Sequence, residues 1–306
     1  MRGLLVTVAV AVMSSPAAAA GAAVGGQMTV HGIAGVVAAG TRVQRLAGGL
    51  KGTEGAIGMP DGSVLFCEFN ANRIVHIDSS GHLSPYLEDS NRPIGLGIDA
   101  RGRLVAAESL DPRIEALTPR RVTLADSFAG QPLVRPNDVV VDTRGGIYFT
   151  DPIPNPKIQF RAPPPGRKAL LLYIGPAGRV VKLTDAVTQP NGVELSPDGK
   201  VLYAVDGDRI VAFDVHSDGM VGRPRMFAEV TGDGLAMDAA GRLYVATRRG
   251  IEIFSATGQA LGLIPTPTRI QSIAFAGAGR KTLYAVGGGA VYRIPLLAEG
   301  VKGRAK

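Results

Sequence analysis

The sequence predicts an all-β fold, a six-bladed β-propeller with a metal site in its central channel. Three observations predict the fold: short apolar strands, a glycine turn between them, and a repeat period near forty residues. The turn glycines are Gly62, Gly102, Gly145, Gly199, Gly241 and Gly279. They are separated by 40, 43, 54, 42 and 38 residues. Two packed sandwiches, the alternative, would not predict one turn motif repeated six times.

Each repeat contains at least three predicted strands. The second strand follows the turn glycine, at 64–69, 103–108, 146–151, 201–206, 242–247 and 282–287. A third follows, at 73–78, 113–118, 169–174, 209–214, 250–255 and 290–295. Apolar residues before the turn, such as 192–196 and 234–238, predict the first strand. One unit cannot bury both of its faces, so the units are expected to stack around a shared core, with residues 41–48 closing the ring as the outer strand of the last blade.

The two ends of the chain are expected to lie outside the propeller, which we assign to residues 41–297. Residues 1–20 have the anatomy of a secretory signal, with Arg2, an apolar run and an Ala-rich cleavage region. The alternative is an uncleaved anchor helix, but the run is short for a membrane span. The Ala/Gly-rich residues 21–40 predict a flexible leader, and 298–306 a basic tail. We therefore expect a periplasmic or secreted protein with no transmembrane anchor after cleavage.

Composition excludes several kinds of chemistry. The single cysteine, Cys67, excludes a disulfide framework and a cysteine-based zinc site. The four histidines show no HxH or HExxH spacing, and the chain has no phosphate-binding loop or nucleophile elbow. The net charge of +7 comes without a run of Lys or Arg in the body of the chain. A nucleic-acid partner is therefore not expected.

A ring of polar residues emerges from the repeat. Eight residues before each turn glycine lie Glu54, Ile94, Asn137, Asn191 and Asp233, and in the looser sixth unit Gln271 or Ser272. The first strand of each blade lines the channel of a propeller, so these positions are expected at one height around the axis. Carboxylate and amide oxygens suit a hard cation such as Ca²⁺, Mg²⁺ or Mn²⁺. The alternative is that Asn or Asp before Gly simply makes turns, and that Glu54 is a solvated loop acid.

The motifs around these residues resemble the senescence marker protein/gluconolactonase family, which includes regucalcin and phosphotriesterase relatives. The motifs are RPNDVVVD at 135–142 with YFTDP at 148–152, QPNGVELSPDG at 189–199, GDGLAMD at 232–238, TEG at 53–55 and GRLVAAE at 102–108. The resemblance covers roughly residues 45–296. The sequence departs from the family with Ala56 for a usual Pro and Ser109 for a frequent His, which bears on the substrate.

The resemblance implies a six-bladed propeller that holds a divalent cation and hydrolyses lactones. Its metal ligands would be Glu54, Asn191 and Asp233, with Asn137 a direct or water-mediated ligand. Asp233 would also be the catalytic base, and Arg135 matches a position that contacts substrate in some members. Ca²⁺ is the first expectation for the cation, with Mg²⁺, Mn²⁺ or Zn²⁺ as alternatives.

The expected reaction is hydrolysis of a small lactone or ester. A channel cation would polarise the carbonyl while Asp233 deprotonates the attacking water. One alternative is a phosphotriesterase-like hydrolase, and another is a non-catalytic, metal-stabilised binding propeller of the cell envelope. The long connection at 152–168 should lie on the metal face, where Phe160 and Arg161 are candidates for contact with substrate. A surface excursion held extended by its prolines is the alternative for that connection.

Overall fold

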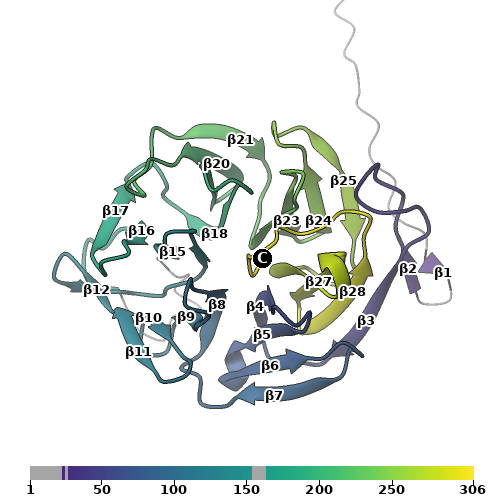
Figure 1. Ribbon diagram of the computed structural model, residues 1–306, viewed down its shortest axis with the longest axis horizontal. Helices are drawn as coiled ribbons and strands as arrows, with labels where there is room; N and C mark the ends of the chain where they lie inside the picture. The colour runs from purple at the N-terminus through teal and green to yellow at the C-terminus, as the bar shows by residue number, and fades with distance from the viewer. Residues whose placement is uncertain (1–22, 25–26, 154–162) are drawn as a thin grey trace, which may run out of the picture.

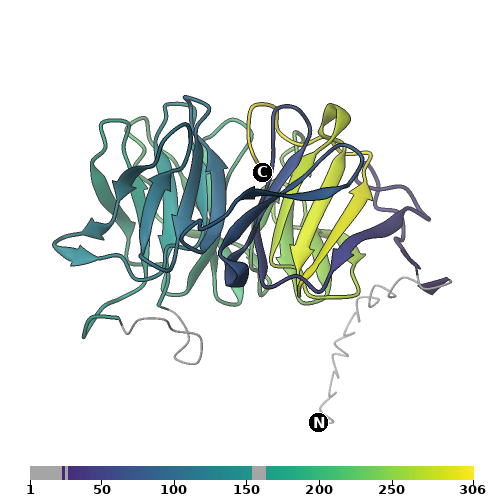
Figure 2. The same ribbon diagram turned by 90° about the horizontal axis from the view of Figure 1, so that it is seen from below.

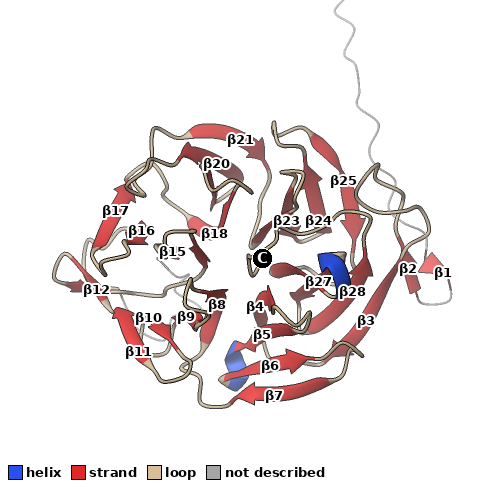
Figure 3. Ribbon diagram, in the orientation of Figure 1, coloured by secondary structure: helices blue, strands red, loops and turns tan. Residues whose placement is uncertain are grey.

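A computed structural model describes residues 23–24, 27–153 and 163–306. In this structure the protein forms a six-bladed β-propeller (Figures 1 and 3). Each blade is an antiparallel sheet whose strands run between the two faces of a disc (Figure 2). The prediction of the fold is therefore confirmed. Within the described ranges no helix has the length and apolar character needed to cross a membrane.

The strands follow the predicted order within each blade. The innermost strands are β4 (Thr53–Gly58), β8 (Pro93–Ile98), β14 (Val139–Val141), β18 (Pro190–Leu195), β22 (Leu235–Met237) and β26 (Ser272–Ala276). The second strands are β5 (Val64–Glu68), β9 (Leu104–Glu108), β15 (Ile147–Asp151), β19 (Val201–Asp206), β23 (Leu243–Thr247) and β27 (Thr282–Gly287). The third strands are β6 (Arg73–Ile77), β10 (Arg113–Ala116), β16 (Leu170–Ile174), β20 (Arg209–Asp214), β24 (Gly250–Phe254) and β28 (Ala290–Pro295).

The outer strands complete the blades and close the ring. They are β7 (Leu83–Leu87), β11 (Val122–Ala125), β17 (Val180–Thr184), β21 (Arg225–Glu229), β25 (Ala260–Pro265) and, for the sixth blade, β3 (Arg42–Gly48). β3 pairs antiparallel with β28, with Gly48 opposite Ala290, so the beginning of the propeller and its last blade share one sheet. This confirms the predicted closing strand. Small additions are the β12 (Ser127–Phe128) and β13 (Gln131–Pro132) hairpin and two short 3₁₀ turns, η1 (Phe69–Ala71) and η3 (Ala278–Arg280).

The predicted glycine turns join the first and second strands. All six turn glycines have φ between +62° and +86°, in the left-handed region that side chains disfavour. In several blades an aspartate three residues earlier holds the turn. The Asp142 Oδ1 atom, for example, accepts hydrogen bonds from the backbone N–H groups of Arg144 at 2.8 Å and Gly146 at 2.9 Å. The glycine therefore recurs because every turn needs a left-handed residue, and in several blades a carboxylate cap supports the turn.

The core lies between the blades. Every residue of the second strands β5, β9, β15 and β23 is buried, because each blade covers the face of its neighbour. Between the third and fourth blades, the rings of Tyr148 and Tyr173 lie 4.5 Å apart, and Phe213 packs in the same cluster. An isolated blade would expose these faces, so the ring folds as one unit.

The N-terminal segment differs from the prediction. Residues 27–40 were expected within a flexible leader, yet they pack on the sixth blade through β2 (Gln27–Thr29), which pairs with β3 and with β1 (Ala23–Val24). The Val36 and Val37 side chains are buried in the cluster that contains Ile253 and Phe275. The Ala- and Gly-rich composition of this segment did not reveal these few apolar side chains. The burial of each one stabilises the packed segment.

The C-terminal segment also differs from a solvated tail. Residues 303–306 enter the central channel, and Figure 1 shows the C-terminus at the centre of the ring. Lys306 is only 6% exposed. Acidic groups on the channel wall, described below, provide the partners that make burial of these basic residues possible.

The innermost strands meet through direct backbone contact around the channel. Glycine follows the ring position in four blades, and in each case it faces the carbonyl oxygen of the next blade's ring residue. A Cβ atom would lie 2.4 Å from Ile94 O if added to Gly55, 2.5 Å from Asn137 O at Gly95, 2.3 Å from Asp233 O at Gly192, and 2.7 Å from Gln271 O at Gly234. Real Cβ atoms do not approach an oxygen so closely, so glycine is required here by proximity.

The other two blades use a side chain in place of glycine. The Asp138 Oδ2 atom accepts a hydrogen bond from Val193 N at 2.9 Å, and the Ser272 Oγ atom accepts one from Ala56 N at 2.9 Å. The Asn-Gly and Asp-Gly pairs are thus blade-to-blade contacts that determine the width of the channel.

We predict that Gly192→Ala destabilises the propeller by about 2 kcal/mol or more, because the added methyl group forces the fourth and fifth blades apart. Urea unfolding followed by fluorescence measures the change. Gly175→Ala is the matched control, since the nearest atom to its Cβ would lie 3.7 Å away. Equal stabilities of the two variants would contradict the contact described here.

Candidate metal centre in the channel

β-bulges turn the ring side chains toward the channel. The strand register shifts between Glu54 and Ile57 in β4, and again between Pro190 and Val193 in β18. A bulge interrupts the alternation of side chains along a strand and changes the direction of one side chain. The two bulges here direct Glu54 and Asn191 toward the channel. Asn137 and Asp233 lie immediately before β14 and β22, where the chain enters the channel wall.

The structure brings the predicted ring together. One small cavity is lined by Glu54, Ile94, Asn137, Asn191, Asp233 and Gln271, together with the residue that follows each of them except Ile94. The four residues predicted as metal ligands therefore converge from four different blades. In the sixth blade Gln271, rather than Ser272, occupies the ring position. Ile94 is the apolar member.

Hydrogen bonds hold the two carboxylates of the ring. The Gln271 Nε2 atom donates to Glu54 Oε1 at 2.5 Å, and Gln271 Oε1 accepts from Gly288 N at 3.3 Å. Asn191 donates a side-chain hydrogen bond to the carboxylate of Asp233. Gln271 therefore orients Glu54 from the neighbouring blade, a role that the sequence analysis did not assign to it.

The electrostatics of the ring disfavour two ionised carboxylates without a cation. Burial, and then the charge of Asp233, raise the pKa of Glu54 well above its usual range. Burial also raises the pKa of Asp233 to about 7, although the hydrogen bond from Asn191 and the charge of Arg269 oppose this shift. Desolvation and repulsion of like charges both favour the protonated forms.

Arginine side chains lie within reach of these carboxylates. Burial lowers the pKa of Arg135, while the charges of Glu54 and Asp233 raise it, so the guanidinium lies close enough for both carboxylates to act on it. Its Nε atom is buried and has no hydrogen-bond partner in the described part of the chain. The backbone N–H of Arg135 donates to Asp151 Oδ1 at 2.7 Å, which fixes the loop that carries it. Arg269, exposed before β26, is a second cation near Asp233 and was not predicted.

The ring has the chemistry of a hard-cation site. Its donors are carboxylate and amide oxygens, and the space between them has room for about one water-sized sphere. Two carboxylates match the charge of a divalent ion. Among the described residues no group of three or more His, Cys, Asp or Glu side chains could hold a metal, so amide oxygens would have to complete the ligand set. The residues present therefore fit a Ca²⁺- or Mg²⁺-type ion.

The long connection of the third blade begins and ends on the face that carries the ring. Asp151, at the end of β15, accepts a hydrogen bond from Arg167 Nη2 at 2.5 Å, and both side chains are almost fully buried. Phe160 and Arg161, the predicted substrate contacts, lie outside the described residues. The described ends of the connection lie on the predicted face, and the position of residues 154–162 and their contact with substrate stay predictions.

We predict that the metal-free protein loses stability as the pH rises from 5 to 8. The pKa values of Glu54 and Asp233 in the folded state lie above those of the unfolded chain. Their contribution to the free energy of unfolding is therefore complete below the unfolded pKa of about 4 and is lost as the pH rises toward the folded values. Thermal melts in EDTA should show a fall of several degrees across this range. Asp233→Asn should flatten the curve, and a wild-type curve as flat as that of the variant would contradict the prediction.

Known proteins share both the sequence and the architecture. Residues 52–287 match the family described as the SMP-30/Gluconolactonase/LRE-like region. A gluconolactonase from Zymomonas mobilis is 26% identical over 262 residues, which cover 73% of this chain and 72% of that protein. The solved structure of a gluconolactonase from Xanthomonas campestris aligns with a TM-score of 0.81 and 26% identity, over 92% of this chain and 99% of that one. The structure of a calcium-binding protein, regucalcin, from Agrobacterium tumefaciens has the same fold, with a TM-score of 0.69 and 17% identity over 85% and 95% of the two chains. Because the family match spans most of the propeller, the chain belongs to the SMP-30/gluconolactonase/LRE-like family.

Proposed function

We propose that the protein is a divalent-cation-dependent lactonase whose cation binds in the channel ring. Glu54, Asn137, Asn191 and Asp233 would be its ligands, and a small-molecule lactone or related ester its substrate. Ca²⁺ is the first candidate for the cation, with Mg²⁺, Mn²⁺ and Zn²⁺ as alternatives. The observation that carries the proposal is the convergence of these four oxygen donors, from four blades, on one ion-sized space.

The ring residues can divide the work of lactone hydrolysis. When bound, the cation would polarise the lactone carbonyl and stabilise negative charge on its oxygen. Asp233 is positioned to accept the proton of the attacking water, and the hydrogen bond from Asn191 orients its carboxylate. Burial raises the pKa of Asp233 to about 7 and an adjoining cation lowers it, so the carboxylate can be ionised and still act as a base at neutral pH.

Arg135 and Gln271 would support these roles. The Nε atom of Arg135, which has no hydrogen-bond partner among the described residues, would donate to a substrate oxygen at the ring. Gln271 holds Glu54 and takes no part in proton transfer. We further propose that the connection at 152–168 forms part of the substrate wall, since it begins and ends on the ring's face.

The relatives support the substrate class and the metal. Two of them are gluconolactonases at 26% identity, and a third protein with this fold is described as calcium-binding. At this identity the particular lactone is not transferable, and the ring chemistry, rather than the names, supports the reaction type.

We expect turnover of simple lactones that is lost in EDTA and restored by one of Ca²⁺, Mg²⁺, Mn²⁺ or Zn²⁺. Asp233→Asn keeps the shape of the side chain and should lower kcat/KM by at least about 100-fold, because it removes a metal ligand and the base together. Asp208→Asn is the matched control, since Asp208 is an exposed acid next to β19 and should leave turnover unchanged.

Three other results would redirect the proposal. Lactone turnover by Asp233→Asn at the wild-type rate would remove Asp233 from the mechanism. Metal-dependent cleavage of phosphotriesters with no lactone turnover would favour the phosphotriesterase-like alternative. Metal binding without turnover of either substrate class would indicate a non-catalytic binding propeller.

We also propose that the protein acts outside the cytoplasm, in the periplasm or after secretion. The support is the signal-like composition of residues 1–20, which lie outside the described residues. Mass spectrometry of protein from the extracytoplasmic fraction should find a chain that begins near residue 21. Protein found only in the cytoplasm, with Met1 retained, would overturn this proposal.

A further inference from the structure

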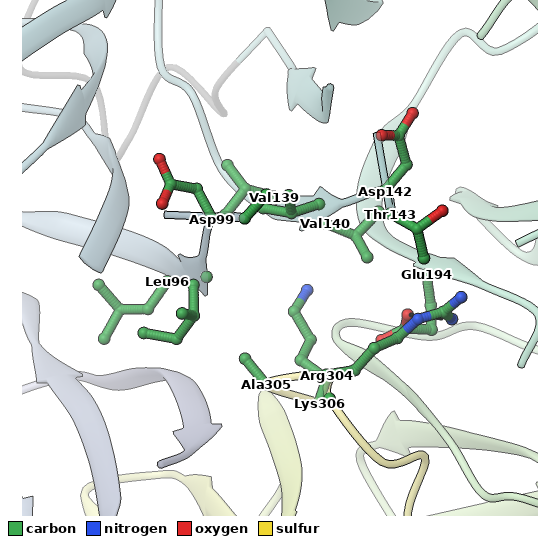
Figure 4. A pocket seen from close by; sticks show the side chains of 15 residues that line it. Leu96, Asp99, Val139, Val140, Asp142, Thr143, Glu194, Arg304, Ala305 and Lys306 are labelled. Atoms are coloured by element: carbon green, nitrogen blue, oxygen red, sulfur yellow. Dashed lines mark ion pairs between the residues drawn. The ribbon is translucent and has the colours of Figure 1, made fainter. Parts of the chain in front are cut away.

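The C-terminal segment, residues 298–306, contacts five of the six blades, and its last residues, 303–306, lie in the channel. Its hydrogen bonds join Ala239 N to Glu299 O at 2.8 Å, Gly300 N to Arg280 O at 2.9 Å, Arg304 Nη1 to Leu195 O at 2.6 Å, Gly58 N to Ala305 O at 2.7 Å, and Lys306 Nζ to Asp138 Oδ1 at 2.5 Å. Figure 4 shows the Arg304 and Lys306 side chains between the walls formed by Leu96, Val139 and Glu194. These contacts hold the segment in place, and we call residues 298–306 the plug.

The plug separates the ring from the opposite end of the channel. Two cavities of about 250 and 290 Å³ flank it on the side of the glycine turns, and residues 303–306 or 302–305 line them. Neither cavity is lined by a ring residue, and the ring cavity is lined by no residue of the plug. Among the described residues, the C-terminal segment therefore stands between the ring and the end of the channel where the glycine turns lie.

Lys306 touches the floor of the ring. Its ammonium donates to Asp138 Oδ1 at 2.5 Å and to Val193 O at 3.3 Å, and the residue is 6% exposed. Asp138 follows the proposed ligand Asn137 and lines the ring cavity. Its carboxylate also accepts hydrogen bonds from Val139 N and Val193 N, each at 2.9 Å, which fix its position between the third and fourth blades. The Lys306 ammonium therefore contacts the wall of the ring cavity through the Asp138 carboxylate.

Three acids line the ring cavity, Glu54, Asp138 and Asp233, which is one more than a divalent cation balances. The charges of Arg135 and Arg269 act on Asp233. The ion-pair partner of Asp138 is Lys306. Glu194 is also buried and lies 3.8 Å from the Arg304 guanidinium, and the charges of Lys306 and Arg304 both act on it. The plug thus brings two cations, Lys306 and Arg304, to the two additional acids, Asp138 and Glu194.

We propose that residues 298–306 are a channel plug and that Lys306 is a positioning residue for the metal ring. By balancing Asp138, its ammonium prevents this third acid from adding its charge to those of Glu54 and Asp233. The metal half of this inference rests on the proposed function. The plug half depends only on the contacts of the segment.

Lys306→Met tests the charge balance, because it keeps the length of the side chain and removes the ammonium. In protein stripped with EDTA at pH 8, calorimetric titration with CaCl₂ should give a dissociation constant roughly tenfold lower than that of the wild type, since an unbalanced Asp138 attracts the ion. The melting temperature of the metal-free variant should fall, because Asp138 then lies in the channel without its ammonium partner. A merely structural role for Lys306 would loosen the ring and weaken Ca²⁺ binding, so the direction of the change separates the two roles.

Two variants control for other effects. Lys302→Met removes the same charge from the same segment, but this side chain is 86% exposed, and it should bind Ca²⁺ and melt like the wild type. Lys306→Arg keeps the charge, and the adjoining cavity of about 250 Å³ has room for the guanidinium, so its dissociation constant should return to within about threefold of the wild-type value.

The outcomes distinguish this inference from the proposed function. If Lys306→Met behaves like Lys302→Met, or binds Ca²⁺ more weakly, the role of Lys306 is overturned. If the wild type binds no divalent cation, the proposed function and the metal half of the inference fall together, and the melting temperatures still test the plug.

If Lys306→Met does not fold, hydrogen exchange of the wild type decides whether the plug is seated. Slow exchange of the Gly58 and Gly300 amides supports a seated plug, and exchange at the rate of exposed amides overturns it.

Discussion

The width of the channel depends on close contact between neighbouring blades, and the candidate site depends on that width. Gly55, Gly95, Gly192 and Gly234 each lie against the carbonyl oxygen of the next ring residue, where a Cβ atom has no room. This contact draws the innermost strands together until side chains from separate blades reach one ion-sized space. β-bulges in β4 and β18 then aim Glu54 and Asn191 inward. The same short segments therefore serve both the packing of the blades and the proposed metal site.

Charge is the second constraint on the channel. Burial and mutual repulsion raise the pKa values of Glu54 and Asp233, and a divalent cation between them would relieve both effects. The further acids Asp138 and Glu194 are paired with Lys306 and Arg304, which the chain itself carries into the channel. In the proposed enzyme, the polypeptide balances the lower acids and leaves the ring for the cation. A stable fold and a reactive site thus depend on the same balance of charges.

The repeat made much of the fold and part of the site predictable. Equivalent positions in equivalent blades must lie at one height, so counting back from the turn glycines located Glu54, Asn137, Asn191 and Asp233 without coordinates. The closing strand was predictable for the same reason, because a ring needs a partner for the last blade. Val36 and Lys306 were not predictable from composition, since each derives its position from a partner distant in the sequence. The role of Gln271 belongs with them, because its contact with Glu54 crosses the closure of the ring.

By itself, the sequence determined the number of blades, the position of each turn and the set of oxygen donors, because these follow from local preferences repeated along the chain. Only the tertiary structure decided that the basic C-terminal residues lie inside the channel, that Gly192 and its equivalents are contacts between blades, and that Asp138 is paired with Lys306. The physical reason is that burial and charge pairing are properties of the assembled ring. A lysine and an aspartate more than a hundred residues apart share no local pattern, and they become partners only when the blades enclose them both.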